Sequence, residues 1–104
     1  RGNVITAGVA FTCDIEVGDF NLFNLNTTVG HDARIGDFNV FNPSVNISGG
    51  VRVGSQVLAG TGCQILENLQ IGDDAILGAG SVVVKNVEPG LTMVGIPAKP
   101  LPSR

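Results

Sequence analysis

Apolar side chains recur at every sixth position along this chain. The fourteen positions are Ile5, Phe11, Val17, Phe23, Val29, Ile35, Phe41, Ile47, Val53, Ala59, Ile65, Ile71, Leu77 and Val83. Only 43% of the residues are hydrophobic, so composition alone does not produce such a run, and it indicates a repeat. These fourteen residues are called the anchors.

Two other positions follow the same period. The residue after each anchor is glycine in seven repeats and asparagine in two, and these residues adopt positive φ most easily. We therefore predict a bend directly after the anchor in nearly every repeat. The fourth residue after each anchor is mostly small or β-branched, which suits a narrow interior and short strands.

A strand and a corner in every six residues predict a three-sided coil of eighteen residues. Fourteen repeats give a little under five coils, stacked as parallel strands about 4.8 Å apart. Residues eighteen apart in the sequence should therefore be neighbours in space. We predict that residues 1–104 form one all-β domain with a continuous inner column.

The residue five positions after each anchor should point outward, and these residues form three columns, one on each wall of the coil. The first column contains Val4, Leu22, Val40, Leu58, Ile76 and Val94, the second Ala10, Thr28, Asn46, Gln64 and Val82, and the third Glu16, Arg34, Arg52, Gln70 and Glu88. The first column is entirely apolar, with Phe20 and Phe38 nearby. Since a soluble monomer rarely exposes such a ridge, we predict self-association through it; a covering domain is the alternative.

Charge and composition exclude several classes of partner. The formal net charge of −3 and a pI near 4.8 argue against nucleic acid and anionic membranes. No apolar stretch is long enough to insert into a membrane. Cys13 and Cys63 are fifty residues apart, which is not a multiple of eighteen, so no disulfide is expected and we predict a reduced, cytoplasmic protein.

The single histidine, His31, follows anchor Val29 by two residues and should project from a corner. Eighteen residues later the chain has Gly49, so a backbone N–H without a side chain should lie one strand spacing from the imidazole. Such a pair can act as a general base beside an oxyanion donor. The alternative is a surface histidine beside an ordinary glycine turn.

Several segments together resemble a known family. They are Asn-Leu-Asn-Thr-Thr-Val-Gly-His-Asp at 24–32, Ile-Gly-Asp-Phe at 35–38, Ile-Gly-Asp-Asp at 71–74, Leu-Gly-Ala-Gly-Ser-Val-Val at 77–83 and Gly-Ile-Pro-Ala-Lys-Pro at 95–100. This pattern is similar to the sugar acetyltransferases of the sialic-acid O-acetyltransferase and bacillosamine N-acetyltransferase type. The resemblance implies a left-handed parallel β-helix, a homotrimer, and an amino-terminal nucleotide-sugar domain that we expect to be absent from this chain.

The resemblance also implies a reaction. Acetyl-CoA would be the donor, and a nucleotide-linked amino sugar or a sugar hydroxyl would be the acceptor. His31 would take the acceptor's proton while the Gly49 N–H binds the carbonyl oxygen. Asp32 could orient His31 or be a solvated carboxylate.

Further candidates are less specific. Asn24 stacks on Asn42 in the eighteen-residue period, either to bind substrate or as a ladder that relieves two bends. Lys85 and Lys99 are candidates for the path of the coenzyme tail, although exposed lysines are usually only solubilising.

Competing classes fit this sequence less well. Carbonic anhydrases with this coil use three histidines to hold zinc, and one histidine per chain cannot supply them, so no metal is expected. An ice-binding coil would need a threonine ladder, but Thr28 is followed in its column by Asn46 and Gln64. A purely structural, non-catalytic β-helix for assembly remains the main alternative.

Overall fold

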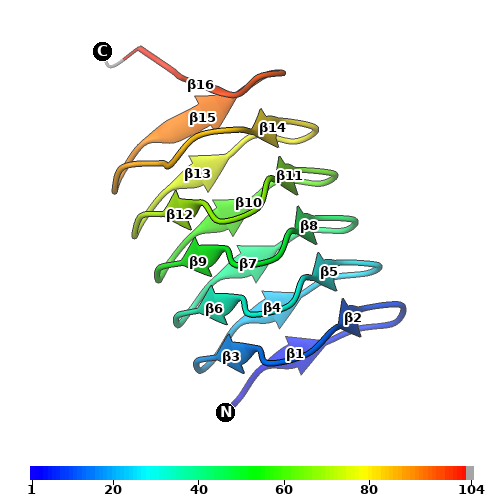
Figure 1. The fold of residues 1–104 in the computed structure, drawn as a ribbon. Coiled ribbons are helices and arrows are strands. Elements are labelled where there is room, and N and C mark those ends of the chain that lie inside the picture. The colour runs from blue at the N-terminus through cyan, green and yellow to red at the C-terminus, as the bar shows by residue number, and fades with distance from the viewer. Residues whose placement is uncertain (103–104) are drawn as a thin grey trace.

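The computed structural model describes residues 1–102, and they form a left-handed parallel β-helix with three walls (Figure 1). The first wall consists of β1 (Val4–Ile5), β4 (Leu22–Phe23), β7 (Val40–Phe41), β10 (Leu58–Ala59), β13 (Ile76–Leu77), β15 (Thr92–Val94) and β16 (Lys99–Pro100). The second consists of β2 (Ala10–Phe11), β5 (Thr28–Val29), β8 (Asn46–Ile47), β11 (Gln64–Ile65) and β14 (Val82–Val83). The third consists of β3 (Glu16–Val17), β6 (Arg34–Ile35), β9 (Arg52–Val53) and β12 (Gln70–Ile71).

Pairing between coils follows the predicted eighteen-residue period through most of the chain. Strand partners such as Val4 and Leu22, or Thr28 and Asn46, differ by eighteen in number. Among the strands of residues 1–102, all pairs are parallel except β15 with β16. The molecule measures 36 × 22 × 21 Å, and within residues 1–102 no helix has the length and apolar character needed to cross a bilayer.

The last coil is two residues shorter than the others, which corrects two of the predicted columns. Ile76 pairs with Thr92, so Thr92 and not Val94 continues the first column. On the third wall Ile71 forms a bridge with Val87, so Glu88 does not follow Gln70. The shortening falls after Val83, beyond the last anchor.

A side chain compensates for part of this shortening. The N–H of Gln70 donates to Asn86 Oδ1 at 2.8 Å. In the preceding coil the equivalent N–H, that of Arg52, donates to the backbone oxygen of Leu69. Asn86 therefore supplies an acceptor that a backbone carbonyl supplies elsewhere, and the coil closes without leaving this N–H unpaired.

The interior confirms the two predicted inward positions. The anchors from Phe23 to Val83 are buried, and Phe23 stacks on Phe41 with ring centroids 5.1 Å apart. The second inward position is also buried from Asn21 onward, apart from a partly buried Leu69. Anchors in the first coil are less covered, and Ile5 is 54% exposed.

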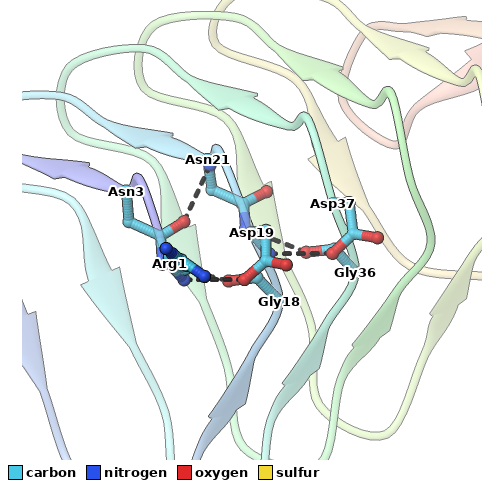
Figure 2. Close-up of polar contacts among 7 residues, drawn as sticks. All are labelled: Arg1, Asn3, Gly18, Asp19, Asn21, Gly36 and Asp37. Atoms are coloured by element: carbon cyan, nitrogen blue, oxygen red, sulfur yellow. Dashed lines mark hydrogen bonds and ion pairs between the residues drawn. The ribbon is translucent and has the colours of Figure 1, made fainter.

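An asparagine ladder, which the six-residue period does not predict, runs inside the corner that joins the third wall to the first. Asn3 Oδ1 accepts the Asn21 N–H at 2.8 Å, and the Asn3 side-chain amide donates to the Gly18 oxygen (Figure 2). Asn21 and Asn39 repeat both bonds one and two coils later. Buried amides are thus paired, and among the described residues no buried side-chain nitrogen or oxygen lacks a partner.

The predicted position of the bends is wrong by two residues. Positive φ occurs three residues after the anchor, for example at Phe20, Asp32 and Gly80. Glycines directly after an anchor, such as Gly30, do not have positive φ. A Cβ on Gly30 would lie 2.5 Å from the Gly49 nitrogen, so glycine is required there by the close approach of the next coil.

Candidate functional site

The corner between the second and third walls carries His31 and is called the His31 corner. It comprises residues 12–15, 30–33, 48–51, 66–69 and 84–86. Strand β5 ends at Val29 and β6 begins at Arg34, so His31 lies on the turn between them, as predicted. Its side chain is 67% exposed and is therefore accessible to a substrate.

The His31 ring lies directly against Gly49 of the next coil. A Cβ on Gly49 would lie 2.6 Å from His31 Nε2 and 2.7 Å from Cε1. The Gly50 N–H donates to the His31 oxygen at 2.8 Å, which holds the two coils in register. Any side chain at position 49 would therefore displace the imidazole, and glycine leaves its backbone open beside Nε2.

Asp32 contacts the other nitrogen of the ring. His31 Nδ1 lies 3.1 Å from Asp32 Oδ2. A carboxylate at Nδ1 favours the tautomer in which Nδ1 carries the proton and Nε2 is a free acceptor. Nε2 has no hydrogen-bond partner among residues 1–102. The arrangement thus leaves the nitrogen nearest Gly49 available to accept a proton.

The Gly49 N–H is also unpaired. At the corner that joins the third wall to the first, the N–H groups of Asp19, Asp37 and Ser55 each donate to a side chain of the following coil, at 2.8–2.9 Å. Figure 2 shows the bond from Asp19 to Asp37. Within residues 1–102 no acceptor pairs with the Gly49 N–H, nor with the equivalent N–H groups of His31 and Glu67, so the imidazole beside it is what distinguishes Gly49 at this corner. A free amide therefore lies beside a free imidazole nitrogen, an arrangement suited to acyl transfer.

Asn24 and Asn42 lie at a different corner. They follow β4 and β7, between the first and second walls, and are not brought to His31. Asn24 Oδ1 accepts the Leu25 N–H at 2.8 Å, and the Asn42 backbone oxygen accepts from the Thr27 hydroxyl. The first bond is local and the second joins neighbouring coils, and both stabilise the corner.

Lys85 and Lys99, the two lysines predicted to bind the coenzyme, lie in different parts of the fold. Lys85 is exposed in the shortened part of the His31 corner, three coils after His31, or about 14 Å along the axis at the usual strand spacing. Lys99 belongs to β16 and pairs with Val94 at the edge of the first wall.

Both cysteines are free, and their environments differ. Cys13 is exposed and precedes His31 by one coil, a neighbour that subtracting eighteen from 31 could have revealed. Cys63 is buried, and this burial raises the pKa of its thiol, an effect that the hydrogen bond from Ser81 partly offsets. We therefore expect Cys13 to be the accessible thiol of the pair.

Residues 50–85 match the family model described as bacterial transferase hexapeptide, six repeats. No curated protein sequence gives a significant match to the chain. Solved structures match over nearly the whole fold.

WeeI from Acinetobacter baumannii AYE has a TM-score of 0.85 and 32% identity, and the match covers 95% of this chain and 54% of WeeI. Neisseria gonorrhoeae serine acetyltransferase has a TM-score of 0.83 and 31% identity, with 91% and 40% coverage. PerB from Caulobacter crescentus, solved with CoA and GDP-perosamine, has a TM-score of 0.74 and 25% identity, with 96% and 57% coverage.

The chain thus spans about half of these proteins, or less. Acetyltransferases are prominent among the matches, and sugar and amino-acid acceptors both occur in their names. The hexapeptide repeat and the structural matches therefore support acyl transfer, and they leave the acceptor open.

Proposed function

We propose that this chain is the β-helix domain of an acetyl-CoA-dependent acetyltransferase that modifies an amino sugar or a sugar hydroxyl. The observation that carries the proposal is the His31 ring packed against Gly49, whose N–H is unpaired. A β-helix used only for assembly has no need of an exposed imidazole held against a glycine of the next coil. The similarity to structures of acetyltransferases supports acetyl transfer as the reaction.

Each group at the His31 corner has a defined task in this proposal. His31 Nε2 accepts the proton of the acceptor's amino or hydroxyl group as that group attacks the thioester carbonyl. The Gly49 N–H donates to the carbonyl oxygen as negative charge develops on it. His31 then returns the proton to the thiolate that leaves when the C–S bond breaks. Asp32 orients the imidazole through Nδ1.

Acetyl-CoA supplies the acetyl thioester, and a nucleotide-linked amino sugar of the sialic-acid O-acetyltransferase or bacillosamine N-acetyltransferase type is the acceptor we favour. Lys85 and Lys99 would hold the phosphates of the coenzyme. Asn24 and Asn42 would contact substrate from the adjacent corner. The reaction needs no metal, and a cytoplasmic location would keep Cys13 reduced.

A homotrimer is part of the same proposal. The outward side chains of the first wall from Val4 to Ile76 are apolar, and Leu58 and Ile76 are 41% and 43% exposed. Phe20 and Phe38 stack beside this wall with ring centroids 5.5 Å apart. A closed ring covers such a surface by heterologous contacts, and it can bring one copy's corner against a neighbour's wall. Sedimentation equilibrium tests the trimer, and a monomer would exclude it.

Turnover tests the proposed function. We expect the chain to release CoA thiol from acetyl-CoA when given a suitable amino sugar from a panel of nucleotide-linked and free sugars. Because His31→Ala removes the base from an exposed corner, it should keep the wild-type melting temperature and lose at least about a hundredfold in kcat. Wild-type turnover in His31→Ala, or no binding of acetyl-CoA by the wild-type protein in calorimetry, would overturn the proposal.

A further inference from the structure

Two arginines lie next to each other on the third wall, and neighbouring groups hold one of them, Arg34, in place. Arg34 of β6 and Arg52 of β9 are direct strand partners. Like charges at directly opposed positions destabilise a sheet. Local conflicts of this kind occur in natural proteins mainly at functional sites.

The surroundings of the two arginines differ. Arg34 Nε lies 2.9 Å from Glu16 Oε2, and Arg34 Nη1 donates to the backbone oxygen of Asp14 at 2.7 Å. Arg52 is exposed, and its guanidinium has no hydrogen-bond or ion-pair partner among residues 1–102. Glu16 is thus already occupied by Arg34, and the unneutralised cation on this wall is Arg52.

A shallow groove of about 640 Å³ runs along the same wall. Its lining includes Arg34 and Arg52 near one edge and Gly36, Gly54 and Gly72 near the other. A Cβ on Gly36 would lie 2.6 Å from the Gly54 oxygen and a Cβ on Gly72 would lie 2.5 Å from the Pro89 nitrogen, so neither glycine tolerates a side chain. The groove therefore combines a bare backbone floor with a free guanidinium.

The arginine edge of the groove adjoins the His31 corner. Strand β6 begins three residues after His31, and Arg52 follows Gly49 by three residues. Three extended residues span at most about 10 Å, so one small molecule can contact both Arg52 and the base. Gln70 is the next strand partner of Arg52 and offers a side-chain amide. Because the last coil is short, Asn86 and not Glu88 follows Gln70 in this column, although Glu88, like Glu16, is among the residues that line the groove.

We propose that Arg52, with Gln70 and Arg34 beside it, binds a phosphate group of a substrate whose reacting end lies at the His31 corner. A guanidinium matches phosphate oxygens with two parallel hydrogen bonds, and Arg34 adds positive charge from the neighbouring coil. The inference rests on the proposed function for the identity of the substrate. The phosphate belongs either to the acetyl donor or to a nucleotide-linked acceptor.

Calorimetry with inorganic pyrophosphate tests the site. At low ionic strength we expect pyrophosphate to bind the wild-type protein and to bind Arg52→Gln at least about tenfold more weakly, with Arg52→Lys in between. Arg1→Gln is the matched control, because it removes the same charge from a side chain that lies outside the groove. Equal affinity in Arg52→Gln and wild type would overturn the site.

Titrations with coenzyme A and with UDP identify the source of the phosphate. A loss confined to coenzyme A in Arg52→Gln assigns the groove to the donor, a loss confined to UDP assigns it to the acceptor, and no loss for either overturns the inference. Failure here is separable from failure of the proposed function. If Arg52→Gln turns over with unchanged KM values, only the proposed phosphate site is refuted. If pyrophosphate binds through Arg52 but the protein transfers no acetyl group, only the proposed enzymatic function is refuted.

Discussion

The residue at position 49 determines whether the His31 imidazole can lie against the backbone of the next coil. Gly49 does not have positive φ, so its backbone conformation would accept an alanine. The cost of a side chain there comes from the His31 ring, which occupies the space of a Cβ. The ring is exposed and can rotate away, and the fold can therefore survive a change that the site cannot.

We predict that Gly49→Ala lowers kcat at least about tenfold and leaves the melting temperature within a few degrees of wild type. The reason is displacement of the imidazole from the amide that binds the oxyanion. Steady-state acetyl transfer and thermal unfolding measure the two effects. Glu67→Ala, one coil further along the same corner, is the control and should retain activity. Full activity in Gly49→Ala would show that the ring does not work from its observed position.

At the scale of single residues, the sequence predicts that His31 and Gly49 are neighbours, but it does not predict which backbone N–H groups are hydrogen-bonded. Adding eighteen to 31 was enough to place Gly49 beside His31. The unpaired state of the Gly49 N–H became visible only by contrast with Asp19, whose N–H is capped by Asp37. Whether a side chain accepts a hydrogen bond from a corner N–H depends on its rotamer, and the repeat period does not specify rotamers.

The corners explain why glycine occurs at two positions in the repeat. Three residues after the anchor, the backbone is left-handed, and nine residues other than glycine accept this conformation, among them Phe20, Asn26 and Gln56. Directly after the anchor, glycine is favoured because coils approach closely. Enrichment in glycine and asparagine looks the same for either cause, so the sequence alone predicts positive φ directly after the anchor, where the structure does not have it.

Alanine and asparagine substitutions at Gly60 and Gly80 separate the two causes. Gly80 has φ of 68° and open space around a Cβ, so Gly80→Ala should cost about 1 kcal/mol and Gly80→Asn less. A Cβ on Gly60 would lie 2.5 Å from the Ala79 nitrogen, so Gly60→Ala and Gly60→Asn should both cost about 1–3 kcal/mol. Urea unfolding measures these differences. Recovery of stability by asparagine at position 60 would contradict the explanation.

The six-residue period of apolar anchors accounts for the fold of the whole molecule. The structure departs from this period after the last anchor, in the short last coil. Fourteen anchors specify the coil and its three walls, and the register confirms this down to Leu77 and Val83. The short last coil follows the final anchor, so hydrophobic spacing carried no information about it. Residues of the proposed site lie at two corners and, in the case of Lys99, at the edge of the first wall, and a neighbouring copy offers a way to bring Asn24 or Lys99 to a His31 corner.

The most direct test is a nuclear magnetic resonance titration of the tag-free protein with acetyl-CoA. The chain has one histidine, so the imidazole signals belong to His31 without further assignment. Our account predicts that acetyl-CoA shifts the His31 ring signals and the Gly49 amide signal together, with one saturation curve. Binding that leaves both signals unchanged, or that shifts only residues of the corner containing Asn24, would contradict it.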